Sequence, residues 1–112
     1  MAKVIITRAL EEEVLAKFKG NSEKVFRHMK KLESQPTLGK SLGNVGKLVI
    51  KEIRYENFRF YFITDGYVLK FGSAEELAKL LIKFVKISGK KDQQKTTEKI
   101  KNIIRSMGFE GF

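Results

Sequence analysis

The sequence predicts an α+β fold in one domain that spans residues 1–112. Apolar residues recur at helical spacing near both ends of the chain, whereas β-rich runs separated by turn signals follow one another in the middle. The composition, 42% apolar with nine Phe in 112 residues, is sufficient for one buried core. We therefore expect a single core and no second domain.

The first part of the chain is predicted to form a strand and a helical hairpin. Residues 3–7 are β-rich and indicate the strand. Two helices, at residues 10–18 and 21–34, are predicted from apolar side chains at helical spacing, namely Leu10, Val14, Leu15, Phe18, Val25, Phe26, Met29 and Leu32. Gly20 ends the first helix and Asn21 can cap the second. Pro36 and the glycines between residues 39 and 46 indicate a mobile connection to the sheet.

The middle of the chain is predicted to form an antiparallel meander. Residues 47–55 and 58–64 are two strands joined by a short connection at Glu56 and Asn57. A turn at Asp65 and Gly66 leads to a third strand at residues 67–71.

The last part of the chain is predicted to contain an inserted helix, a final strand and a terminal helix. Ser73 and Glu76 have the spacing of a capping box, which opens a short helix that extends to residue 81. Residues 82–87 are β-like, and residues 92–107 have the apolar spacing of a helix.

The chain is strongly basic. Its 23 Lys and Arg against 13 Asp and Glu give a net charge of +10. A polyanionic partner follows from this charge: nucleic acid, an anionic membrane or an acidic protein. The alternative is a lysine-rich surface that serves solubility and ion-pair networks.

The rare residue types exclude several classes of site. With no Cys and a single His, His28, the chain has neither a disulfide framework nor a thiolate or histidine metal site, and no His-dependent triad. We expect no metal and no cofactor. Neither a signal peptide nor an apolar run of about 18 residues is present, so we expect a cytoplasmic protein without a membrane span.

The segment Gly39-Lys40-Ser41 imitates the end of a phosphate-binding P-loop. The glycine that this motif requires five residues earlier is replaced by Ser34, so an NTPase is rejected. Lys40 and Lys47 could still lie near the phosphates of a polyanion, although an ordinary loop explains them equally well.

Arg59 is the most informative single residue, because it interrupts an apolar run in which a guanidinium must find a partner. Strand alternation places Arg59, Tyr61 and Ile63 on one face. Either this face forms the floor of a functional site, or Arg59 forms a structural ion pair with Glu52 or Glu56 across the hairpin.

Further cations could join Arg59. Lys51 or Arg54 could stand beside it, depending on a strand register that the sequence does not determine. Lys90 and Lys91 precede the last helix, where they form either a phosphate cradle or an ordinary polar turn.

Residues 36–104 resemble the RelE/ParE toxin superfamily, and most of all its phage-derived HigB branch. The resemblance is carried by the order and spacing of several segments: Pro36-Thr37-Leu38-Gly39-Lys40-Ser41-Leu42, Glu52-Ile53-Arg54, Phe58-Arg59-Phe60-Tyr61-Phe62, Phe84-Val85-Lys86, Lys90-Lys91 and Gln94-Lys95. It implies a RelE-like fold in which the N-terminal strand and helical hairpin pack on a mainly antiparallel, twisted sheet that a C-terminal helix completes.

The resemblance also implies a function. It is that of the toxin in a type II toxin–antitoxin pair, a metal-independent endoribonuclease that cleaves mRNA at the ribosome and is silenced by an antitoxin protein. The implied catalytic residues are Arg59, Lys91, Arg54 and Lys51, and the implied RNA-binding residues are Lys40, Lys47, Lys86, Lys90, Lys95 and Tyr61. A silent ParE-like inhibitor, an antitoxin-binding relative and a basic nucleic-acid-binding module remain as alternatives.

The chain departs from RelE at three positions. The two strand lysines of RelE fall on Ile50 and Glu52, and its helix tyrosine falls on Thr97.

Overall fold

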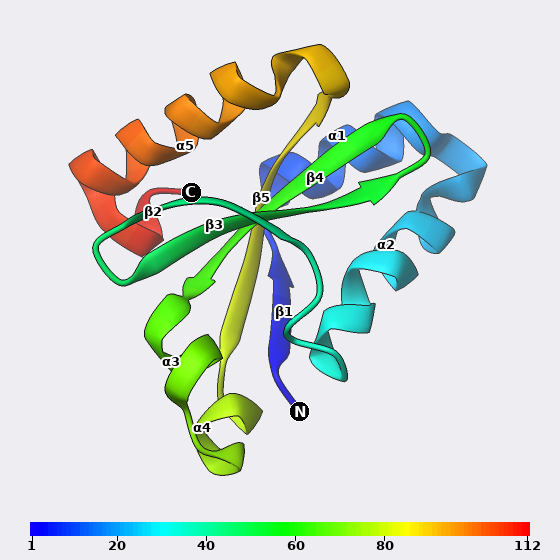
Figure 1. Ribbon diagram of the computed structural model, residues 1–112. Coiled ribbons are helices and arrows are strands. Elements are labelled where there is room, and N and C mark those ends of the chain that lie inside the picture. Colours follow the sequence, from blue (N-terminus) through cyan, green and yellow to red (C-terminus); the bar gives the residue numbers. More distant parts are fainter.

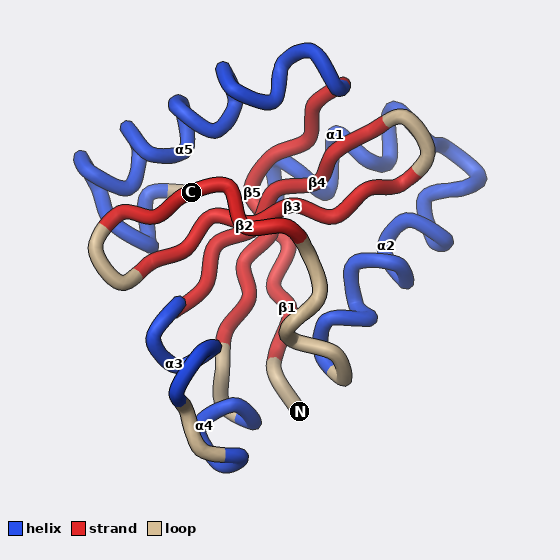
Figure 2. Tube along the Cα trace, viewed as in Figure 1, coloured by secondary structure: helices blue, strands red, loops and turns tan.

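Five strands form one sheet in the order β1-β5-β4-β3-β2 (Figure 2). The computed structural model describes residues 1–112. Its strands are β1 (Lys3–Ile6), β2 (Lys40–Val45), β3 (Leu48–Tyr55), β4 (Phe58–Asp65) and β5 (Leu81–Gly89). The pairing of β1 with β5 is parallel, whereas the other three pairings are antiparallel. The protein is therefore α+β with a mostly antiparallel sheet, as the sequence predicts.

Helices cover both faces of this sheet (Figure 1). The helices α1 (Arg8–Phe18) and α2 (Ser22–Lys30) lie on one face, and α5 (Gln93–Met107) lies on the other. The short helices α3 (Gly66–Phe71) and α4 (Ala74–Ala78) connect β4 to β5. None of the helices combines the length and apolar character that a membrane crossing requires.

The sheet separates two apolar clusters. The larger one joins Phe60 and Phe62 of β4 to buried residues of α1 and α2, including Leu10, Val14, Val25 and Met29. The smaller one joins Tyr61 and Ile63 to Ile100 and Ile104 of α5. The alternation predicted for residues 58–63 is thus confirmed, because odd and even positions of β4 enter different cores.

Local capping explains where several helices begin. The Thr7 hydroxyl accepts the backbone N–H of Leu10 at 3.3 Å and so opens α1. Ser73 and Glu76 form the predicted capping box at the start of α4. That helix ends at Ala78, three residues earlier than predicted, because β5 already begins at Leu81.

The prediction of a third meander strand at residues 67–71 is wrong, since this segment is α3. The Asp65 carboxylate accepts the backbone N–H groups of Tyr67 and Val68 at 3.0 and 3.1 Å, which makes Asp65 an N-cap and not the first residue of a hairpin turn. The strand that pairs with β4 on this side is β5.

The prediction of a mobile connection at residues 39–46 is also wrong. Residues 40–45 form the edge strand β2, with an irregularity between Ser41 and Gly43. Gly39, at φ +102°, lies so close to the sheet that a Cβ atom would stand 2.9 Å from the Glu52 carbonyl oxygen. A glycine is required here because the chain approaches the sheet closely.

Candidate nucleic-acid interface

The β3–β4 hairpin and the end of β5 enclose an open cleft of about 770 Å³. No hydrophobic side chain lines it. Four of its lining residues are cations and two are anions, and the complete lining is Arg54, Glu56, Asn57, Arg59, Gly89, Lys90, Lys91 and Asp92. We call this the cationic cleft.

Strand register brings the two arginines together. Arg54 and Arg59 are direct cross-strand partners in the antiparallel pairing of β3 with β4, so their side chains leave the same face of the sheet. Lys90 and Lys91 reach the cleft from a 3₁₀ turn at Lys90–Asp92, between β5 and α5. Three of the four residues predicted to be catalytic, Arg54, Arg59 and Lys91, therefore line one cleft.

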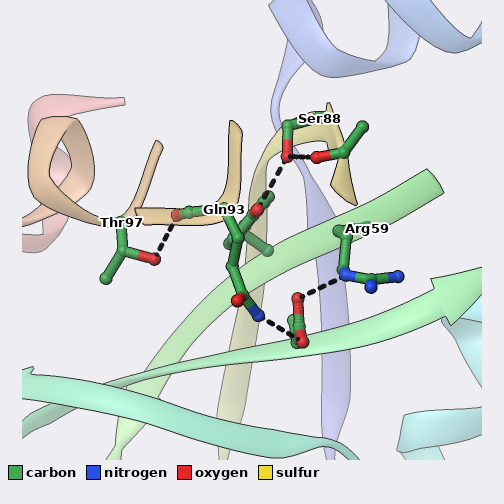
Figure 3. A network of polar contacts seen from close by, with 7 residues as sticks. Arg59, Ser88, Gln93 and Thr97 are labelled. Carbon is green, nitrogen blue, oxygen red and sulfur yellow. Dashed lines mark hydrogen bonds and ion pairs between the residues drawn. The ribbon is translucent and has the colours of Figure 1, made fainter. Parts of the chain in front are cut away.

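Arg59 is held from below by a buried carboxylate. Its Nε lies 3.6 Å from Oε2 of Glu52, and the two side chains are only 7% and 1% exposed. Gln93, at the start of α5, donates from Nε2 to Oε1 of the same carboxylate at 2.7 Å. Figure 3 shows this chain of contacts from Gln93 to Arg59. Of the two partners that the sequence left open for Arg59, the structure selects Glu52.

The pair leaves part of the arginine available. Nε of Arg59 and Oε2 of Glu52 are fully enclosed and make no hydrogen bond. Arg59 also lines the cleft, and its terminal nitrogens Nη1 and Nη2 take part neither in the contact with Glu52 nor in a hydrogen bond within the chain. These are the two nitrogens with which a guanidinium binds an oxyanion.

Lys51 does not reach the cleft. It lies on the opposite face of the sheet, where Nζ donates to the carbonyl of Thr37 at 3.1 Å and stands 6.0 Å from the ring centre of Phe62. Burial lowers the pKa of Lys51 from its ordinary value of 10.5. A side chain in this position cannot act together with Arg59 on one substrate atom.

Tyr61 is enclosed as well. Its hydroxyl and that of Ser88 lie 2.7 Å apart in a hydrogen bond beneath α5, and the side chain is not exposed at all. Burial, the largest effect, raises the pKa of Tyr61 above 10.0. Tyr61 thus stabilises the packing of α5 on the sheet and has no surface for RNA in this conformation.

The lysines predicted to bind RNA are dispersed. Lys90 lines the cationic cleft, and Lys40 lines a neighbouring cavity. Half-buried Lys86 stands opposite Tyr61 in the register of β4 with β5, and Lys95 is exposed on α5. Lys47 lies beyond the other end of the hairpin, 3.7 Å from Asp65. Of this group, only Lys90 belongs to the cleft itself.

The sequence pattern gives no indication of a role for Gln93. Its contact with Glu52 joins residues 41 positions apart, and nothing in the local pattern signals such a contact. The sequence indicates Asn57 only as part of the short connection between two strands, and it gives no signal for Gly89.

The chemistry available in the cleft is ionic. Arginine forks and lysine ammonium groups bind phosphate oxygens and stabilise negative charge that develops on them. Glu56 and Asp92 add carboxylates that can accept a proton. Comparison of the chain with protein-family models, curated proteins and solved structures finds no match to any of them. Function is therefore inferred from the cleft and its residues.

Proposed function

We propose that this chain is the toxin of a type II toxin–antitoxin pair, and that it binds mRNA at the ribosome and cleaves it in the cationic cleft. One observation carries the proposal: Arg54, Arg59 and Lys91, which come from three segments of the sequence, line the same open cleft. These are residues to which the resemblance to RelE and HigB gives catalytic roles. We propose the antitoxin partner and the ribosome on the basis of that resemblance.

The charge of the cleft suits a phosphodiester backbone. Four cations face two carboxylates, so the cleft has a net positive charge before any ligand binds. Its walls are polar and open, which suits an extended single strand better than a small apolar ligand. Phosphate contacts of this kind dominate the affinity of proteins for nucleic acids.

The same residues can support cleavage by attack of a ribose 2′-hydroxyl on the adjacent phosphorus. In our proposal, Nη1 and Nη2 of Arg59 hold the scissile phosphate and stabilise its extra negative charge in the transition state. Glu56 or Asp92 accepts the proton of the 2′-hydroxyl, and Lys91 donates a proton to the departing 5′-oxygen. The P–O5′ bond breaks as the P–O2′ bond forms, which leaves a 2′,3′-cyclic phosphate and a free 5′-hydroxyl.

A second candidate is a catalytically silent relative of these toxins that only binds its antitoxin. It is favoured by Glu52, which neutralises part of the Arg59 charge from below, and by Lys51, which lies on the other face of the sheet. Both features weaken the charge available for transition-state stabilisation.

The test is induction of the chain in cells without any antitoxin, with mapping of RNA 5′ ends. The variants Arg54→Ala and Lys91→Ala are preferred because both side chains are exposed and their loss leaves no buried charge. Lys47→Ala, outside the cleft, is the control. Growth arrest with new 5′-hydroxyl ends that both cleft variants abolish would support the proposal. Arrest without new ends would favour a ParE-like inhibitor that acts without cleaving RNA. No arrest would refute a toxin and favour the silent relative or a nucleic-acid-binding module.

A further inference from the structure

A second cavity adjoins the cationic cleft at Arg54, which lines both. It measures about 450 Å³ and is bounded by α2, the loop before β2 and the end of β3. The complete lining is His28, Leu38, Gly39, Lys40, Glu52, Ile53 and Arg54. We call it the side cavity.

The side cavity exists because β2 is shorter than β3. Pairing of the two strands begins at Lys40 opposite Glu52, so residues 53–55 of β3 have no strand partner on this side. His28 of α2 occupies part of the open edge, with Nε2 2.8 Å from the carbonyl oxygen of Arg54. Because a carbonyl only accepts hydrogen bonds, Nε2 carries the hydrogen, and in the neutral ring Nδ1 is left as an acceptor.

The walls of the side cavity differ from those of the cationic cleft. Leu38 and Ile53 supply apolar surface, and Leu38 is 38% exposed although it is a leucine. Gly39 supplies bare backbone, held against the sheet by its approach to Glu52 and Phe62. Such a surface accepts a flat, weakly polar group, and two of the lining residues, Lys40 and Arg54, are cations.

We propose that the side cavity binds the nucleobase of an unpaired RNA nucleotide whose neighbouring phosphate lies in the cationic cleft. This inference rests on the proposed function, since it assumes an RNA strand on Arg54 and Arg59. The base packs against Leu38 and Gly39, and the phosphate on its other side meets Lys40. The cations of the cleft, the apolar part of the side cavity at Leu38 and Ile53, and Lys40 match the order of phosphate, base and phosphate along a single strand.

The test measures base-dependent affinity separately from phosphate affinity. Two nuclease-resistant hexamers are compared by fluorescence anisotropy, one of 2′-fluoro-adenosine and one of the same backbone without bases. We expect wild-type protein to bind the adenosine hexamer about tenfold more tightly than the abasic one. Leu38→Ser should reduce this ratio to about two while leaving the abasic affinity unchanged, because the phosphate contacts persist.

Two further variants make the result specific. Leu15→Ser alters another exposed leucine, on α1, that lines neither cavity, and it should keep the tenfold ratio. Arg54→Ala should weaken both hexamers, because it removes a phosphate contact. Thermal melting followed by circular dichroism verifies that each variant is folded.

The outcomes separate the two proposals. A ratio in Leu38→Ser equal to that of wild type would overturn the base-binding cavity and leave the cationic cleft intact. If wild-type protein binds neither hexamer more tightly than Arg54→Ala does, the side cavity and the proposed function both fail.

Discussion

Glu52 and Arg59 face each other beneath the floor of the cationic cleft, with Oε2 and Nε 3.6 Å apart and neither atom hydrogen-bonded. Removing two charges from water costs several kcal/mol each in free energy, which their mutual attraction and the bond from Gln93 to Oε1 of Glu52 offset. The pair therefore holds Arg59 in place more than it stabilises the fold.

Breaking this pair on one side should be more harmful than replacing both partners. Arg59→Ala leaves Glu52 buried and unpaired, and we expect the free energy of unfolding to fall by about 3–5 kcal/mol. The double variant Arg59→Met, Glu52→Gln should recover most of this loss, because no buried charge remains. Urea denaturation of the two variants and wild type measures both values. An equal loss of unfolding free energy in the single and double variants would contradict the assignment of Glu52 and Arg59 as a buried ion pair.

Gln93 should contribute to stability through its bond to the Glu52 carboxylate. In Gln93→Ala the buried Oε1 loses its donor at 2.7 Å, and we expect a loss of about 1–3 kcal/mol in unfolding free energy. Gln94→Ala, which alters the exposed neighbour on the same helix turn, should change it by less than about 0.5 kcal/mol. Two equal values would mean that the Gln93–Glu52 bond does not stabilise the protein.

Phosphate binding in the cleft should depend on salt and on Lys91. We expect Lys91→Ala to weaken binding of single-stranded RNA about 3- to 10-fold at 0.1 M salt and to reduce the slope of log K against log salt by about 0.7. Lys47→Ala, outside the cleft, should have little effect on either. Anisotropy titrations at several salt concentrations measure both quantities, and an equal slope change in the two variants would refute a localised site.

Lys51 should be dispensable for RNA binding although the family resemblance assigns it a catalytic role. Its ammonium lies on the face opposite Arg59, so Lys51→Met should retain wild-type RNA affinity. Because burial lowers the pKa of Lys51, its charged form is disfavoured by folding at neutral pH, and the same variant should be somewhat more stable than wild type at pH 7. A loss of RNA affinity as large as that of Lys91→Ala would contradict this placement.

Tyr61 should make stability decrease at high pH. Burial raises its pKa in the folded chain above the ordinary value of 10.0, so the folded state keeps a proton that the unfolded state releases. Its contribution is present in full below pH 10 and is lost as the pH rises from there through the folded pKa. Urea denaturation between pH 9 and about pH 11 should give a steeper decline for wild type than for Tyr61→Phe. Parallel declines would show that the hydroxyl is not buried in solution.

Much of this fold followed from local sequence patterns. Local sequence patterns predicted helices α1 and α5, the β3–β4 hairpin and the capping box at Ser73. Each of these depends on residues that lie within a few positions of one another. Alternation likewise separated Arg59 from Phe60 on β4.

The predictions failed at two segments. Residues 67–71 have β-rich composition, but the nearby Asp65 caps them as a helix, and the distant strand β5 takes the place beside β4. The glycines of residues 39–46 indicated a loop, yet β3 was available as a partner and made this segment an edge strand.

The site shows the same division. The sequence alone determined that Arg59 lies in an apolar strand and needs an anionic partner, because a guanidinium is costly to bury unpaired. Only the tertiary structure decided that the partner is Glu52, that Gln93 joins it, and that Arg54 rather than Lys51 stands beside Arg59. The reason is strand register: a shift by one residue moves every side chain to the opposite face, and packing of the whole sheet selects the register.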